Sequence, residues 1–321
     1  MIGTNNMKAL TVSAALLFGT SAGFQLMAPT QRQQTKTQTQ THQSPFAVTA
    51  ANTLVGGAQP ALASTKTMLS AASTASEDED RVLDTEAIAK YAGAVVAQMT
   101  LLAGLFTGLD ALVGATGVRV PFAVNFFFFF VLALKSRMFN PMSNERPKKD
   151  TKEIVDAVQR KMPEWTPPGV VFPIVWILII GPLRAASSAL LVTSAATGTA
   201  ATAAYASPAV LALMLHLSIG DTWNTINNVE RRYGTSVVGV ACVWISAAFA
   251  AFQYGQVDAL AGKLLSIPLI WLTIASSLIV RTWQINPTPS TGEKESFLPT
   301  KPASQEGSIT KFTWFDGKKA E

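Results

Sequence analysis

Residues 165–176 read Trp-Thr-Pro-Pro-Gly-Val-Val-Phe-Pro-Ile-Val-Trp, and Arg184 is the only charged residue between Pro168 and Val192. Proline is tolerated at a helix start, because the first N–H groups have no partner within the helix. A membrane helix needs about 20 mostly apolar residues. This stretch therefore predicts a rigid entry into a membrane-spanning helix, with the indole of Trp165 just outside it. Spacing alone leaves open whether the tryptophans form an interfacial belt or a ligand site.

Similar stretches with few charges continue on both sides, and composition agrees with them. Charged residues make up 14% of the chain, against roughly 25% in ordinary soluble domains, and 49% of the residues are hydrophobic. One cysteine excludes an intrachain disulfide framework, and two histidines make a metal site unexpected. We therefore predict an all-α membrane protein. Besides the span at 168–192, the other spans are expected at about 88–114, 120–134, 208–228, 234–254 and 264–283.

The N-terminal region resembles a targeting leader. It contains no Asp or Glu before Glu77, and its lysines and arginines carry most of the net charge of +5, which therefore does not indicate nucleic-acid binding. Residues 1–23 combine a lysine, a short apolar run and small residues, which is typical of a signal peptide. Residues 24–80 are rich in Gln and Thr and suit a transit peptide or a disordered segment. Together they resemble the two-part presequence that targets proteins to algal plastids enclosed by extra membranes. The alternative is a disordered N-terminus with a fortuitous apolar run.

Basic residues in the loops predict the orientation. The linker from Lys135 to Glu164 carries eight Lys or Arg, and the loop after 208–228 adds Arg231 and Arg232. The opposite loops carry only Arg119 and Lys263. The positive-inside rule then puts the linker, that loop and the C-terminus on one side, the stromal side of a plastid membrane. The tail at 287–321 has no long apolar run and is predicted to be disordered.

Two charges inside predicted spans are candidates for function. Arg184 and Asp221 are costly in hydrocarbon, so each should face the bundle interior and find a partner. We expect them to pair with each other. Asn224 and Asn228 follow Asp221 at helical spacing, which suggests one polar face on the 208–228 helix. A purely structural pair is the alternative to a ligand role.

His216 lies on the same predicted helix. It is a candidate ligand for a tetrapyrrole metal, although a lone histidine on a helix more often forms hydrogen bonds. In the 264–283 span, small residues from Ala275 onward follow Trp271 by one turn. That leaves room beside the indole for a flat ligand or for a neighbouring helix.

Taken together, Trp165-Thr-Pro-Pro, Phe172-Pro-Ile-Val-Trp176, Trp223 and the stretch from Leu269 to Asn286 resemble the TspO/MBR family of tryptophan-rich sensory, or translocator, proteins. The resemblance implies a five-helix membrane bundle over 118–286, often dimeric, with 88–114 as an extra N-terminal span. It also implies a pocket among the helices, capped by the loop between the first two, that binds porphyrins, haem-related tetrapyrroles or, in some members, sterols. The pocket residues would be Trp165, Trp176, Trp223, Trp271 and Ala275.

The chain departs from the family pattern at several positions. Arg184 replaces a small residue of the family's second helix, and the third helix, usually aromatic, carries the polar face. Ile279 and Val280 stand where the family's final helix often has an Asn and a Tyr. The Tyr belongs to the proposed sterol motif, so we do not expect sterol binding here. A buried arginine favours an anionic ligand, such as a tetrapyrrole with propionate groups.

The sequence thus predicts tetrapyrrole binding, with a role in transport, sensing or homeostasis. The expected site comprises Trp165, Trp176, Arg184, His216, Asp221, Trp223, Asn224, Trp271 and Ala275. The first alternative is a structural or assembly factor of a plastid pigment–protein complex. Enzymatic breakdown of tetrapyrroles, attributed to some family members, ranks last because no acid–base pair requires it. We expect no tightly required cofactor, and the bilayer, a small tetrapyrrole or lipid and a second copy of the chain as partners.

Overall fold

The computed structural model describes residues 80–145, 160–197, 205–288 and 292–314. The predicted signal peptide and residues 24–79 of the predicted transit segment lie outside the described residues. The same is true of residues 146–159 of the basic linker.

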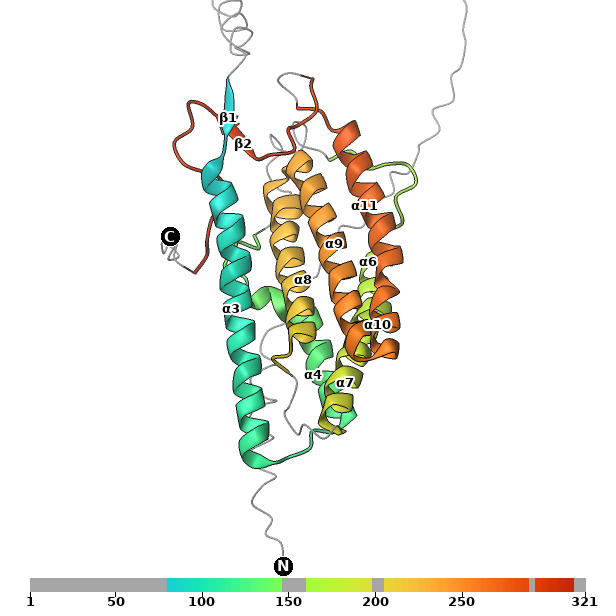
Figure 1. Cartoon of the computed structure of the whole chain (residues 1–321). Helices are drawn as coiled ribbons and strands as arrows, with labels where there is room; N and C mark the ends of the chain where they lie inside the picture. The colour runs from blue at the N-terminus through green and yellow to red at the C-terminus, as the bar shows by residue number, and fades with distance from the viewer. Residues whose placement is uncertain (1–79, 146–159, 198–204, 289–291, 315–321) are drawn as a thin grey trace, which may run out of the picture.

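Helices dominate the described residues (Figure 1). They are α3 (Thr85–Thr116), α4 (Phe122–Lys135), η1 (Ser136–Phe139), α6 (Val171–Ile174), η2 (Val175–Ile180), α7 (Gly181–Thr197), α8 (Pro208–Thr225), η3 (Ile226–Glu230), α9 (Tyr233–Val257), α10 (Ala259–Ser266) and α11 (Pro268–Ile285). Two short strands, β1 (Arg81–Leu83) and β2 (Thr300–Pro302), pair antiparallel. The predicted all-α class is confirmed, with this small sheet as an addition.

Local sequence explains several helix boundaries. The Asp84 side chain accepts a hydrogen bond from the Ala87 N–H and so caps α3. Gly117 ends that helix in the left-handed region, at φ 62°. Ser207 caps α8 in the same way as Asp84 caps α3, and prolines open both α8 and α11.

The helix that begins within the Trp165–Trp176 stretch is widened in its middle. Residues Val175–Ile180 form a π-helical segment, η2, between α6 and α7. Pro182 has no backbone N–H, so the usual hydrogen bond to the carbonyl of Leu178 cannot form, which favours such a distortion. Trp176 lies in this widened segment, and π-helical turns often mark functional sites.

Helix α9 lies at the centre of the bundle. It contacts α8, α10 and α11, while α7 contacts α4 and α10 (Figure 1). Helix α3 packs along α8 on the other side. A hydrophobic core drawn from these helices includes Leu102 and Phe106 of α3, so the extra N-terminal helix is part of the bundle and not an appendage.

Five described helical segments are long and apolar enough to cross a membrane, which supports a multi-pass membrane protein. They are Thr85–Thr116, Phe122–Phe139, Val171–Ser194, Tyr233–Val257 and Ala259–Ile285. The span expected at 208–228 is not among them, because polar residues such as His216, Asp221 and Asn224 lower the hydropathy of α8. This helix is nevertheless enclosed between α3 and α9. That it crosses the membrane stays a prediction.

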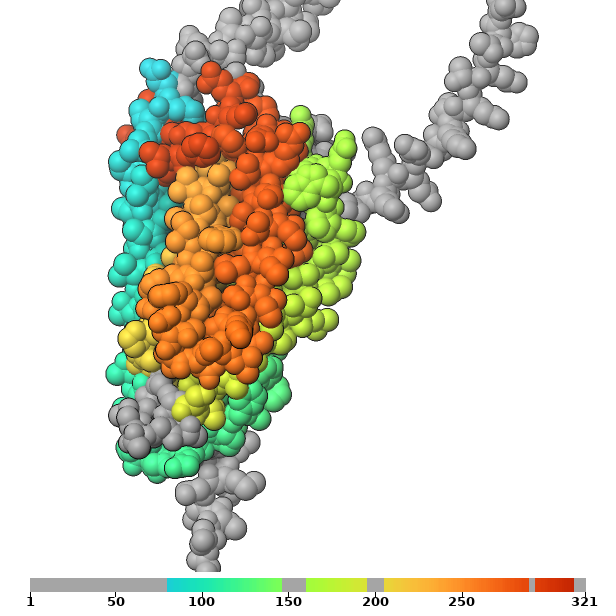
Figure 2. All heavy atoms as spheres, turned by 45° about the vertical axis from the view of Figure 1, so that its right-hand side comes forward, coloured from blue at the N-terminus to red at the C-terminus, as the bar shows by residue number. Residues whose placement is uncertain are grey.

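The prediction of a disordered C-terminal tail at 287–321 is wrong for residues 292–314. Strand β2 of this segment pairs with β1, in a register that sets Leu83 against Thr300. A further bridge joins Met142 to Phe312. Figure 2 shows the C-terminal segment (red) lying against the start of α3 (cyan) at one end of the bundle.

Specific contacts, rather than a hydrophobic pattern, hold this tail. The backbone of Ser296 passes so close to Gly234 that a Cβ there would lie 2.1 Å from the Ser296 carbonyl oxygen. The Trp283 indole donates a 2.8 Å hydrogen bond to the carbonyl of Glu295, and its ring lies 4.8 Å from that of Phe297. Polar composition gave no sign of these contacts, because each one pairs residues far apart in the sequence or uses the backbone.

Candidate functional site

A buried arginine, a histidine and a tryptophan meet between α7 and α8. Arg184 is 6% exposed, and its Nη2 lies 2.5 Å from Nε2 of His216. The guanidinium carbon lies 5.3 Å from the centre of the Trp176 ring, within the range of a cation–π contact. Trp176 precedes Arg184 by about two helical turns, so both face the same side of the helix.

The hydrogen bonds of His216 fix its tautomer. Arginine can only donate, so Nε2 of His216 must accept from Arg184. Nδ1 then carries the proton, and it lies 3.1 Å from both the carbonyl oxygen of Val243 and the Oγ of Ser246 on α9. His216 therefore links α7 to α9. Its Nε2 can ligate a metal only if the Arg184 contact is broken.

The predicted pair of Arg184 and Asp221 is wrong. Asp221 accepts a 2.8 Å hydrogen bond from Nε2 of Gln98 on α3, and Gln98 also donates to the carbonyl of Ser136 at 2.9 Å. His216 and Asp221 are five residues apart, so at 100° per residue they point about 140° away from each other. One side of α8 therefore faces Arg184, and another side faces α3.

Asn140 completes the polar contact between α3 and α8. Its Nδ2 donates to Oε1 of Gln98 at 2.8 Å and to Oγ1 of Thr222 at 3.1 Å. Asn224 accepts a 3.0 Å hydrogen bond from Asn228, one turn further along. These polar side chains of α8, including the predicted site residues Asp221 and Asn224, are hydrogen-bonded within the protein.

The predicted tryptophans are only partly brought together. Trp176 and Trp223 pack against one cluster formed by Val243, Ala247 and Leu272. The Trp223 indole donates to the carbonyl of Ser236 at 3.1 Å. It fits against Gly239, where a Cβ would lie 2.7 Å from its ring.

Trp271 and Trp165 lie apart from this cluster. The Trp271 ring meets Phe172 edge-on at 5.7 Å, and its Nε1 is buried without a hydrogen-bond partner among the described residues. Ala275, one turn further, is half-buried. Trp165 is 51% exposed and makes no ring contact with the other described tryptophans.

A small cavity adjoins the arginine. Its volume is about 10 Å³, which is room for about one water molecule. It is lined by Arg184, Leu213, His216, Ala247, Ala250, Leu265 and Pro268. In this conformation the site is closed. The described residues contain no group of three or more His, Cys, Asp or Glu that would hold a metal ion.

Residues 127–284 match the model of the TspO/MBR family. The chain is also 26% identical over 137 residues to Protein CrtK of Rhodobacter capsulatus, covering 42% of this chain and 78% of the relative. Both comparisons support the TspO/MBR family for the helical region.

The TspO/MBR region contains most of the predicted site but not all of its supports. It runs from within α4 to the last turn of α11 and includes Arg184, His216 and the site tryptophans. Helix α3, with Gln98, and the C-terminal segment lie outside it. A single glutamine in an Ala- and Leu-rich helix carries no signal of its partner, so sequence reasoning missed Gln98.

A second missed group fixes the segment that precedes α6. Arg160 donates a 3.0 Å hydrogen bond to Asn227, and its guanidinium lies 5.2 Å from the Tyr233 ring centre. Asn286, after α11, exchanges two 2.8 Å hydrogen bonds with the backbone of Lys161. The segment carrying Trp165 is thereby tied at its start to the ends of α8, α9 and α11.

Proposed function

We propose that this membrane protein binds a tetrapyrrole of the porphyrin or haem type among α6–α7, α8 and α11, and that it acts in tetrapyrrole transport, sensing or homeostasis. The match to the TspO/MBR family supports this class of function. The residues that would contact the ligand are Arg184, Trp176, Trp223 and Trp271.

The observation that carries the proposal is the charge of Arg184. Among the described residues, no carboxylate lies within salt-bridge distance of this buried guanidinium. Its direct partners are the neutral side chain of His216 and the face of Trp176, and Asp221 acts on it only from beyond salt-bridge distance. A buried charge is costly unless an opposite charge meets it. A propionate carboxylate of the ligand would supply that charge in a bidentate hydrogen bond.

The indoles suit the rest of such a ligand. Their ring faces stack on a flat macrocycle, and their N–H groups can reach an acceptor. The Trp271 N–H could donate such a hydrogen bond, because its Nε1 is buried without a partner among the described residues. A ligand acceptor there would remove an unsatisfied donor, which otherwise costs roughly 1–3 kcal/mol.

Binding would require the site to open. A cavity of about 10 Å³ does not admit a macrocycle. We propose that the segment before α6 is the part that moves. Arg160 and Lys161 hold its start, whereas Trp165 further along it is half-exposed. In this proposal it closes over the bound ligand.

The test is a tryptophan-fluorescence titration of the full chain in detergent with protoporphyrin IX, haem and a bilin. The same titration with protoporphyrin IX dimethyl ester removes the carboxylates without touching the protein. We expect saturable quenching by the free acid and about tenfold weaker binding of the ester. Trp271→Ala should weaken binding, and Trp244→Ala on the outer face of α9 should not. Equal affinity for acid and ester would remove the role of Arg184.

We also propose that the ligand is held and not turned over. The absorption spectrum of protoporphyrin IX released after illumination of the complex should then match that of the added pigment. A bleached or shifted spectrum that depends on the protein would contradict this.

A structural role in a pigment–protein complex is the alternative. It is favoured by the hydrogen bond that Asp221 accepts from Gln98, which uses a polar side chain of α8 to join this helix to α3. Native gels would separate the two functions. Co-migration with a photosystem or antenna complex, without saturable tetrapyrrole binding, would support the structural role.

Finally, we propose a plastid membrane as the location, with the basic linker and the C-terminus on the stromal side. This rests on the leader and on loop charge. A fluorescent fusion to residues 1–80 tests the first part, and protease protection of the two sides of the bundle tests the second.

A further inference from the structure

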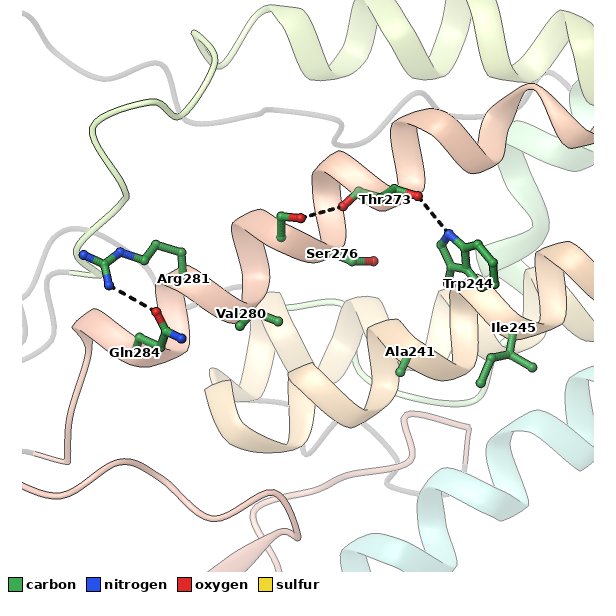
Figure 3. A pocket seen from close by; sticks show the side chains of 9 residues that line it. Ala241, Trp244, Ile245, Thr273, Ser276, Val280, Arg281 and Gln284 are labelled. Carbon is green, nitrogen blue, oxygen red and sulfur yellow. Dashed lines mark hydrogen bonds between the residues drawn. The ribbon is translucent and has the colours of Figure 1, made fainter.

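A groove runs along the outer face of α9 and α11, separate from the Arg184 site. It is an open surface depression with a volume of about 550 Å³. Figure 3 shows it extending from Trp244 and Ile245 at one end to Arg281 and Gln284 at the other. It is lined by Ala241, Trp244, Ile245, Thr273, Ser276, Ser277, Val280, Arg281 and Gln284.

The groove lies on a face that would contact the hydrocarbon of a bilayer. Both of its helices belong to segments apolar enough to span a membrane. Large apolar side chains beside it are turned outward: Ile245 is 63% exposed and Ile270 is 68% exposed. The small residues Ala241 and Ser276 hollow out the surface between these side chains.

The wall of the groove offers little polar recognition. The Trp244 indole donates to Thr273 Oγ1 at 3.0 Å (Figure 3). Ser276 and Ser277 donate to helix carbonyls one turn earlier, at 2.7 and 3.0 Å. These hydroxyl and indole donors are already used, so the wall suits an apolar chain rather than a polar molecule.

One end of the groove is cationic. Arg281 lies on the last turns of α11, exposed, and its Nη1 donates to Gln284 at 3.1 Å (Figure 3). Among the described residues no carboxylate lies within salt-bridge distance of it. From Thr273 to Gln284 the groove covers roughly 16 Å of helix, at 1.5 Å per residue. Arginine near the end of a span reaches the level of lipid headgroups.

We propose that this groove binds an anionic membrane phospholipid, with one acyl chain along the hollow and the phosphate at Arg281. Charge complementarity selects this occupant, since an apolar slot that ends in a guanidinium matches a chain that ends in a phosphate. The site is independent of tetrapyrrole binding.

The test uses full-length protein in nanodiscs of equal parts phosphatidylglycerol and phosphatidylcholine, followed by native mass spectrometry of the retained lipid. We expect preferential retention of phosphatidylglycerol. Arg281→Gln should reduce that retention about fivefold. Lys263→Gln, which removes an exposed cation from α10 at the other end of the span, is the matched control and should leave it unchanged.

Ala241→Leu supplies a second variant, because Ala241 is exposed and a larger side chain there fills the groove without entering the core. We expect it to lower the retention of phosphatidylglycerol while Arg281 is still present. Equal retention of both lipids by the wild type would overturn the proposal, as would unchanged retention in Arg281→Gln. So would crosslinking of two copies through Ile245→Cys in a Cys242→Ser background, since a second copy would then cover the groove.

Discussion

Arg232 donates a 2.6 Å hydrogen bond to Oδ2 of Asp84, and both side chains are buried. Arg232 lies between α8 and α9 in the TspO/MBR region, whereas Asp84 precedes α3, outside it. Ser308 of the C-terminal segment adds a 2.7 Å hydrogen bond to the same carboxylate oxygen. Asp84 therefore joins the region that matches the TspO/MBR model, helix α3 and the C-terminal segment at one end of the bundle.

Asp84→Asn tests this ion pair, because it removes the charge and keeps the shape. Among the described residues, it leaves the buried Arg232 with Glu230, at 3.3 Å, as its remaining carboxylate within salt-bridge distance. We expect a loss of roughly 3 kcal/mol in the free energy of unfolding, since breaking a buried pair strands a charge. Chemical unfolding in detergent measures it.

Glu86→Gln is the control for Asp84→Asn. Glu86 pairs with Lys90 at 2.6 Å, but both side chains are substantially exposed. Solvent-exposed pairs of this kind contribute little to stability. Equal losses in the free energy of unfolding would show that the buried pair contributes no more to stability than the exposed pair.

Glu295 should contribute to the pH dependence of the free energy of unfolding. Burial raises the pKa of this carboxyl above its ordinary value of 4.5, although the N–H groups of Gly234 and Tyr233 act in the opposite direction. The folded protein therefore holds a proton that the unfolded chain releases. The stability from that proton is complete below pH 4.5 and is lost as the pH rises through the folded-state pKa.

We therefore expect Glu295→Gln to flatten the fall in stability between pH 4.5 and neutrality. The slope removed is at most about 1.4 kcal/mol per pH unit. Unfolding midpoints of both proteins across this range measure it. Burial also raises the pKa of Glu230, so some slope of the same sign should remain. An identical pH profile for wild type and variant would contradict the assignment.

Asp84 has the opposite dependence. Burial alone would raise its pKa, but hydrogen bonds from Arg232, Ser308 and the Ala87 N–H together lower it. The stability that ionised Asp84 contributes is present above its pKa in the unfolded chain. It is lost as the pH falls through the pKa of Asp84 in the folded protein. In strong acid, wild type and Asp84→Asn should therefore converge in stability, and a constant difference down to the lowest pH would contradict this.

Much of the helical layout could be predicted from the sequence, because long uncharged stretches and helix-starting prolines are local signals. The stretch 88–114 lies within α3, and Pro208 opens α8 where the expected span begins, whereas the span expected from 264 is divided between α10 and α11, which Pro268 opens. The tail could not be predicted, since strand β2 has three residues and its partner lies more than 200 positions away. The direction of Asp221 was misjudged, because spacing on one helix does not reveal which neighbour each side faces.

Gln98→Ala tests whether the polar contact fixes α3 on α8. The substitution removes the hydrogen bonds of Gln98 with Asp221, Asn140 and the Ser136 carbonyl, which should cost roughly 3 kcal/mol, although Asn140 keeps its bond to Thr222. Hydrogen exchange along α3 should accelerate together with the loss of stability. Thr100→Ala on the same helix is the control, because the Thr100 hydroxyl is exposed and bonds only within the helix. Unchanged exchange in Gln98→Ala would show that apolar packing alone holds α3.

Gly239→Ala tests the seat of Trp223 in the candidate site. The added Cβ would lie 2.7 Å from the indole, so the ring or the helix has to shift, at a cost of about 1–3 kcal/mol. Gly108→Ala on α3 is the matched control. Its Cβ would meet nothing within 4 Å, and replacing glycine inside a helix should add up to about 1 kcal/mol of stability. Near-UV circular dichroism should change in the first variant only.

If Trp223 contacts the tetrapyrrole, the affinity for protoporphyrin IX should fall in Gly239→Ala as well. A changed indole signal with unchanged affinity would instead assign Trp223 to packing.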